Sequence, residues 1–141
     1  MPSIYLPYVN IALDAFALLV TLIIFAVCIS EYSNKKEDSI HFLLLQISVI
    51  IALISDMLGW LGEGHPSLSA MTLVSNTVAS CACQIIILSF MSYLIASFYA
   101  NNRVAKYVLN IFRVLCVFSI ILCIGNAFWG YVYAVNEQGY W

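Results

Sequence analysis

Residues 40–54 read "IHFLLLQISVIIALI" and carry no Asp, Glu, Lys or Arg, whereas residues 55–65 read "SDMLGWLGEGH". About 20 consecutive apolar residues are enough to cross a bilayer as an α-helix. Residues 40–61 therefore predict a membrane-spanning helix, which ends where Gly64 and Pro66 favour a turn. Asp56 lies inside this apolar run. An ionised carboxylate is costly there, so we expect it to have a structural or functional role.

The composition extends this reading to the whole chain. Hydrophobic residues make up 64% of the 141 residues and charged residues 9%, against about 25% charged in soluble proteins. Further apolar runs cover residues 9–30, 68–99 and 104–135, and they are continuous, unlike the short alternating segments of a membrane barrel. The sequence predicts an all-α membrane protein, with one domain over residues 1–141 and four transmembrane helices in an antiparallel up-down bundle.

The positive charges predict the orientation. Lys35 and Lys36 follow the first run, Arg103 and Lys106 lie between the third and fourth runs, and Arg113 is close enough to reach the same side. The stretches before the first run, between the second and third, and after the fourth contain no Lys or Arg. The positive-inside rule therefore predicts a multi-pass protein of the cell membrane with both termini outside.

Several classes of function are disfavoured. A net charge of −2 with five Lys and Arg argues against a nucleic-acid partner. No glycine-rich phosphate loop, nucleophile elbow or HExxH motif is present, so we expect no enzymatic activity. We expect no metal or cofactor either, because the cysteines lie in apolar runs, Cys81 and Cys83 fall on different helix faces, and His41 and His65 are predicted to be solvated.

A polar side chain occurs in each predicted helix: Asp14, Asp56, Asn76 and Asn126. Counted from the predicted outer helix ends, all four lie at depths of about 7 to 14 Å, and Trp60 marks the interface one turn after Asp56. Together these five residues form a candidate outward-facing polar pocket. Two alternatives stay open, namely a structural hydrogen-bond network between helices and an Asp14 that simply reaches water.

Small residues follow one another at intervals of four in the third run, at Ser75, Ala79 and Cys83, with Ser92 and Ala96 further along. Such spacing lets helix backbones approach closely, which predicts that the third helix is central. The alternative is that these residues line a conduction path.

The sequence also carries a resemblance. The stretch "LISDMLGWLGEGHP", Asn76 and Tyr93 in the third run, and "GNAFWGYVYAVNEQGYW" resemble the N-terminal multi-spanning sensor region of bacterial diguanylate cyclases and sensor histidine kinases. The resemblance covers residues 30–141. Its matching positions are Asp56 and Trp60 of an Asp-x-x-x-Trp pattern, Gly64 and Pro66 of the following loop, and, loosely, Asn136 and Tyr140. It implies that the chain holds the first four of about seven or eight helices, with the output domain elsewhere.

The expected function is a sensory or ligand-recognition input region that passes its signal by helix rearrangement. The expected partners are the lipid bilayer, a small-molecule ligand from the outer side, and a second copy or a signalling protein. One alternative is a small oligomeric transporter or channel subunit, in which Asp14 or Asp56 binds a cation or proton. Another is a structural or assembly subunit of a membrane complex.

Overall fold

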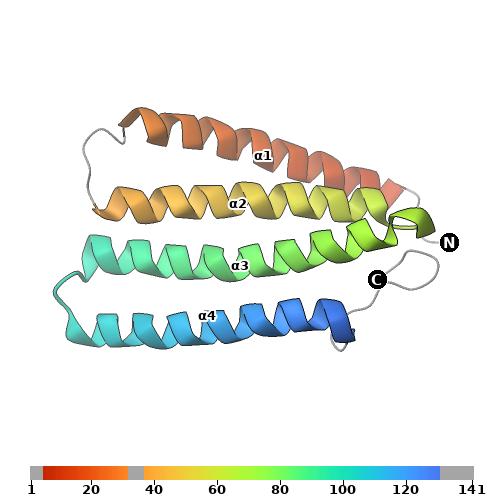
Figure 1. Ribbon diagram of the computed structural model, residues 1–141. Coiled ribbons are helices and arrows are strands. Elements are labelled where there is room, and N and C mark those ends of the chain that lie inside the picture. Colours follow the sequence, from red (N-terminus) through yellow and green to blue (C-terminus); the bar gives the residue numbers. More distant parts are fainter. Residues whose placement is uncertain (1–4, 32–36, 131–141) are drawn as a thin grey trace.

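The computed structural model describes residues 5–31 and 37–130, and these residues form helices joined by short connections. The helices are α1 (Tyr5–Glu31), α2 (Glu37–Gly62), the short 3-10 helix η2 (Pro66–Leu68), α3 (Ser69–Phe98) and α4 (Arg103–Trp129) (Figure 1). Lys35 and Lys36 lie outside the described residues. The predicted all-α fold is confirmed over this part of the chain.

Within the described residues, four segments are long and apolar enough to cross a membrane: Pro7–Ser30, Ile40–Gly62, Pro66–Phe98 and Arg103–Trp129. They coincide with the four predicted runs, which confirms the number and approximate position of the candidate spans. The agreement reflects the continuous apolar composition, which decides helix formation in such segments more strongly than any local signal.

Of the predicted fourth run, the described part forms α4, which ends at Trp129. Residues 131–135, to which the prediction extends, lie outside the described residues. Gly130 adopts the left-handed conformation, with φ of 64°, and its backbone N–H donates to the Asn126 carbonyl over 2.7 Å. A glycine that takes this conformation closes a helix by satisfying one of its last carbonyls.

The helices lie side by side in chain order. α2 packs against α1 and α3, and α3 packs against α2 and α4, with the most extensive contact between α2 and α3 (Figure 1). Among the described residues, α1 and α4 share no extensive contact. The predicted central position of the third helix is therefore confirmed, and α2 shares that position.

Among the described residues, most buried side chains are small or polar, and Ile95 and Leu109 are the large apolar ones among them. The buried side chains with hydroxyl or amide groups are Thr21, Ser48, Ser55, Thr72, Ser75, Ser89, Ser92 and Asn126. Most large apolar side chains point outward instead, with Phe16 68% and Phe128 81% exposed. A hydrocarbon surrounding favours this distribution, because apolar faces need no burial there and small residues permit close helix contacts.

The packing face of α3 differs from the expected stripe. Ser75, Ala82 and Ser89 are buried, whereas Cys83 is exposed. Four residues advance a helix about 40° past one full turn, so a strict interval of four drifts around the axis. An interval of seven returns to within about 20° of the same direction, which keeps these buried residues on one face.

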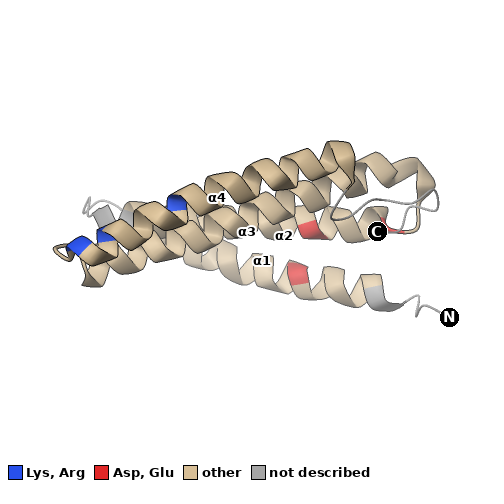
Figure 2. Ribbon diagram, turned by 90° about the horizontal axis from the view of Figure 1, so that it is seen from below, with Lys and Arg blue, Asp and Glu red and all other residues tan. Residues whose placement is uncertain are grey.

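The basic residues of α4 gather toward one end of the helices. Figure 2 shows them there, with the acidic residues Asp14 and Asp56 of α1 and α2 toward the other end. Arg103 and Lys106 belong to the first turn of α4, while Asp14 and Asp56 lie near the start of α1 and near the end of α2. We call these the basic end and the acidic end, and the basic end also holds the acidic residues that end α1 and begin α2, Glu31 and Glu37.

Candidate functional site

Two carboxyl groups meet between α1 and α2. The Asp14 carboxyl lies within side-chain hydrogen-bonding reach of the Asp56 carboxyl. Asp14 Oδ2 is buried, and no described group donates a hydrogen bond to it. Two ionised carboxylates only accept hydrogen bonds and repel each other, so a proton or a cation between them would stabilise this contact.

This carboxyl pair lies in the interface with α2, which among the described residues is the extensive helix contact of α1. Thr21 is the buried side chain among the described residues of α1, and its hydroxyl donates to the Ala17 carbonyl of the same helix over 2.8 Å. Most other side chains of α1 are apolar and exposed. The Asp14–Asp56 contact is therefore a polar link in an otherwise largely apolar interface.

One turn after Asp56, Gly59 of α2 leaves room for the side chain of Asn76 from α3. A Cβ added to Gly59 would lie 2.9 Å from Oδ1 of Asn76 and 3.9 Å from Cβ of Ser75. Asn76 Nδ2 is buried without a hydrogen-bond partner. A buried donor without an acceptor costs about 1–3 kcal/mol, which makes it a candidate contact for a ligand oxygen.

A second close approach follows at Gly62, where an added Cβ would collide with Thr72 Oγ1. Thr72 is fully buried, and its hydroxyl donates to the Leu68 carbonyl over 3.3 Å. The next residue, Glu63, has its Oε2 atom buried without a partner. Desolvation raises the pKa of Glu63 above its usual 4.5. We call Asp14, Asp56, Glu63 and Asn76 the acidic-end polar group.

The other two predicted pocket residues are placed differently. Trp60 is half-buried on α2, one turn after Asp56. Asn126 is 3% exposed on α4, which packs against α3 and lies at the opposite edge of the row from α1. The structure thus brings Asp14 and Asp56 together and sets Asn76 beside Gly59, but it places Asn126 on the far side of α3 from α1 (Figure 1).

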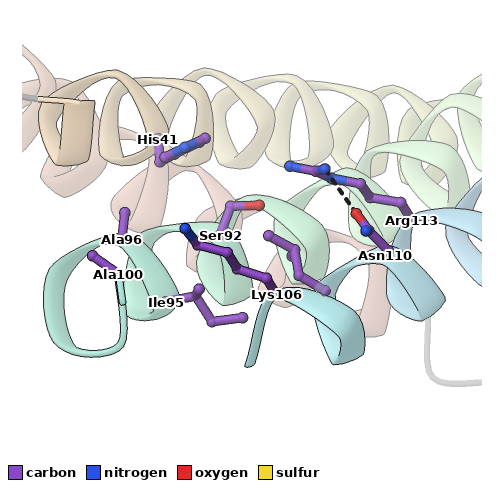
Figure 3. Close-up of a pocket in the computed structure, with 9 residues that line it drawn as sticks. His41, Ser92, Ile95, Ala96, Ala100, Lys106, Asn110 and Arg113 are labelled. Atoms are coloured by element: carbon purple, nitrogen blue, oxygen red, sulfur yellow. Dashed lines mark hydrogen bonds between the residues drawn. The ribbon is translucent and has the colours of Figure 1, made fainter. Parts of the chain in front are cut away.

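The sequence analysis missed a cavity at the basic end. It has a volume of about 380 Å³ and lies among α2, α3 and α4 (Figure 3). The residues around it are His41, Ser92, Ile95, Ala96, Ala100, Lys106, Leu109, Asn110 and Arg113. We call it the basic cavity. His41, which the sequence predicts to be solvated, lies in the first turns of α2, is half-buried and faces this space.

A signal for the basic cavity exists in the sequence but is incomplete. Lys106, Asn110 and Arg113 are spaced by four and three residues, which puts them on one face of a helix. The Arg113 guanidinium Nη1 donates to Asn110 Oδ1 over 3.1 Å. The contribution of His41 depends on the packing of α2 near α4 across α3, which no local pattern reveals.

In residues 5–31 and 37–130, no group of three or more His, Cys, Asp or Glu side chains is arranged to hold a metal ion. No protein-family model, curated protein or solved structure matches the chain. The resemblance to membrane sensor regions stays a prediction, and the function is inferred from the arrangement of side chains.

Proposed function

We propose that the chain is a membrane-embedded input region of a signalling protein, which binds a proton or a small cation from the outer side and responds by moving α1 against α2. The observation that carries this proposal is the contact between the Asp14 and Asp56 carboxyl groups. Carboxylates inside apolar helices generally mark ligand or ion sites, because their cost must be offset by function.

The proposed topology has the four helices crossing the bilayer in alternating directions, with the basic end in the cytoplasm and both termini outside. Its support is the restriction of all Lys and Arg to the first and third connections and the adjoining start of the fourth helix. In this orientation the acidic-end polar group faces the outer side, where an external ligand reaches it.

The proposed switch is electrostatic. Two unit charges about 4 Å apart interact by roughly 4 kcal/mol at an effective dielectric constant of about 20. When the bridging proton or cation leaves, the two carboxylates repel each other by about this energy. A difference of this size shifts the equilibrium between a close and a separated arrangement of α1 and α2 by about 1000-fold. Because α2 is the helix that α1 packs against extensively among the described residues, α1 can move without disturbing the α2–α3 and α3–α4 contacts.

The output in this proposal comes from a partner or from a further domain. The sequence resemblance at Asp56 and Trp60 supports a sensor of the kind that precedes cyclase or kinase domains. Exposed apolar faces on the edge helices, including Phe16 of α1 and Val114 of α4, offer surfaces for further helices or a second copy.

The test measures the separation of α1 and α2 in lipid nanodiscs. Spin labels at positions 16 and 51 in a cysteine-free background report on this pair, and labels at 58 and 74 report on α2 and α3 as a reference. All four native side chains are exposed. We expect the α1–α2 distance distribution to shift between pH 4.5 and 8.5, or on addition of sodium or methylammonium, while the reference distribution stays constant.

Asp14→Asn is the matched variant, since it keeps the shape and removes the charge. It is expected to hold one α1–α2 distribution under every condition. If the wild-type distribution is the same at both pH values and with both cations, the proposed switch does not exist. Distances that respond to sodium but not to pH assign the input to a metal cation rather than to a proton.

A small proton or cation transporter subunit is the second candidate, and the same carboxyl pair favours it. Proteoliposomes that hold a pH-sensitive dye separate the two functions. A transporter produces a flux that Asp56→Asn abolishes, whereas an input region shows the distance change without flux.

A further inference from the structure

From the basic cavity we infer a binding site for a phosphate group, carried by an anionic lipid headgroup or by a soluble phosphate compound. This inference is independent of the proposed function, because it concerns the opposite end of the helices and different residues. Three side chains with N–H donors surround the space, namely His41 from α2 and Lys106 and Arg113 from α4 (Figure 3).

No acidic side chain in the lining of the basic cavity balances the positive charges of Lys106 and Arg113. Arg113 lies ten residues after Arg103, the first residue of α4, which is about 15 Å along an apolar helix. The Arg113 side chain is exposed, so an anion from outside the protein can reach the guanidinium, and a phosphate oxygen is a partner that it binds strongly.

The donors are also arranged for an oxygen-rich ligand. Asn110 Oδ1 accepts a hydrogen bond from Arg113 Nη1, which limits the orientations of the guanidinium and leaves its other N–H groups available. Figure 3 shows the Lys106 amine and the Arg113 guanidinium directed toward the space between α2 and α4, near His41 and Ser92. The imidazole donates one hydrogen bond even in its neutral form, and the Ser92 hydroxyl adds another donor.

The remaining lining fits the part of a lipid that adjoins its phosphate. Ile95, Ala96 and Leu109 contribute apolar surface, and the volume of about 380 Å³ falls in the range of about 300–1,000 Å³ typical of small-ligand sites. In a bound lipid, the phosphate would contact the cationic side chains, and the apolar atoms next to the phosphate would pack against these three residues.

The test uses the full chain, purified in an uncharged maltoside detergent, with binding followed by microscale thermophoresis. The probes are a short-chain phosphatidylglycerol below its micelle concentration, a phosphatidylcholine of the same chain length, and inorganic phosphate. We expect at least one of the two anionic probes to bind, and phosphatidylcholine to bind at least tenfold more weakly than phosphatidylglycerol where the lipid binds. Saturable binding of phosphatidylglycerol assigns a lipid site, and saturable binding of inorganic phosphate assigns a soluble ligand.

The decisive variant is Lys106→Gln with Arg113→Gln, and its control is Arg103→Gln, which removes a nearby cation that does not line the cavity. Charge-assisted hydrogen bonds support an expected loss of about tenfold or more in affinity for the double variant, against less than twofold for the control. If the double variant does not fold, each single substitution is measured separately. Absence of binding by both anionic probes in the wild type overturns the inference, as does an equal loss in Arg103→Gln.

Discussion

Gly59 of α2 and Asn76 of α3 lie against each other so closely that a Cβ on the glycine would be 2.9 Å from Oδ1 of the amide. Both residues belong to the interface with the most extensive contact in the molecule. The missing side chain of Gly59 is therefore what lets a polar group of α3 enter this level of the helix pair.

The first prediction concerns this approach. Gly59→Val is expected to destabilise the fold by about 1–3 kcal/mol, since it forces bulk into a closely packed contact. Replacement of Asn76 by Ala is expected to remove most of that penalty, because the colliding oxygen is gone. The measurement is a double-mutant cycle on the free energy of unfolding in mixed SDS and maltoside micelles.

Gly125→Ala is the control for general effects of losing a helical glycine. Its added Cβ meets the ring of Trp129, 3.0 Å away on the same helix, and that side chain is 70% exposed rather than part of a helix–helix interface. We expect it to change stability by less than about 0.5 kcal/mol. Additive effects of Gly59→Val and Asn76→Ala would contradict the described α2–α3 contact.

The second prediction concerns the cysteines between α3 and α4. The Cys81 thiol lies within hydrogen-bonding reach of the Cys123 thiol, and Cys116 Sγ donates to the Gln84 carbonyl over 3.5 Å. Copper phenanthroline is expected to oxidise Cys81 and Cys123 to an intramolecular disulfide with loss of two hydrogen atoms, detectable as a mass decrease of about 2 Da and by peptide mapping. All the cysteines of the described part are free thiols before treatment.

Cys83 serves as the comparison, because it is exposed and directed away from the α3 packing face. A variant that keeps only Cys83 and Cys123 is expected to form no intramolecular bond under the same conditions. If that pair cross-links as readily as Cys81 with Cys123, the rotation of α3 described above is wrong.

The third prediction is a pH dependence of stability at Glu63, which follows the last residue of α2. Burial raises its pKa above 4.5 in the folded state. Between pH 4.5 and that raised value the folded state binds more protons than the unfolded state, so stability falls as pH rises through this window. Glu63→Gln is expected to remove this loss, which makes the variant more stable than wild type at pH 8 and no more stable below pH 4.5.

The readout is the unfolding free energy between pH 4 and 8. His65→Gln is the control, since it removes the other titratable side chain of the same connection and leaves the carboxyl in place. It should keep the part of the pH dependence that Glu63→Gln abolishes. Parallel curves for wild type and Glu63→Gln would show that the Glu63 carboxyl is solvated.

The fourth prediction concerns the end of α4. Gly130 has φ of 64°, so Gly130→Ala places a Cβ in the left-handed region at a cost of about 1–2 kcal/mol. Gly130→Asn is expected to cost less, because asparagine tolerates this conformation better. Thermal unfolding of both variants checks the order, and an alanine variant as stable as wild type would contradict the helix end at Trp129.

The candidate spans were predictable because their lengths and apolar composition leave few alternatives. Asp14, Asp56 and Asn76 were identified as unusual from their depth in the apolar runs alone. The contact between Asp14 and Asp56 could not be predicted, because it depends on which faces α1 and α2 turn toward each other. The role of Gly59 was not predicted, because a glycine near a helix end is equally compatible with a cap or with close packing.

The basic cavity was missed for a different reason. Lys106 and Arg113 were interpreted only as topology signals, since the positive-inside rule explains such residues without any site. The cavity becomes visible only when His41, distant in sequence, is placed near them by the packing of α2, α3 and α4. Interfaces between helices are set by shape, which composition does not encode.

In the proposed topology, the position of the Asp14–Asp56 contact makes its occupancy sensitive to the membrane voltage. In a membrane whose interior is negative, a cation displaced across the full potential changes in energy by about 2.3 kcal/mol per 100 mV. With the basic end inward, Asp14 and Asp56 lie toward the outer side of that field. A proton or cation that enters the Asp14–Asp56 contact from outside then crosses part of the field, so its occupancy is expected to rise as the membrane hyperpolarises.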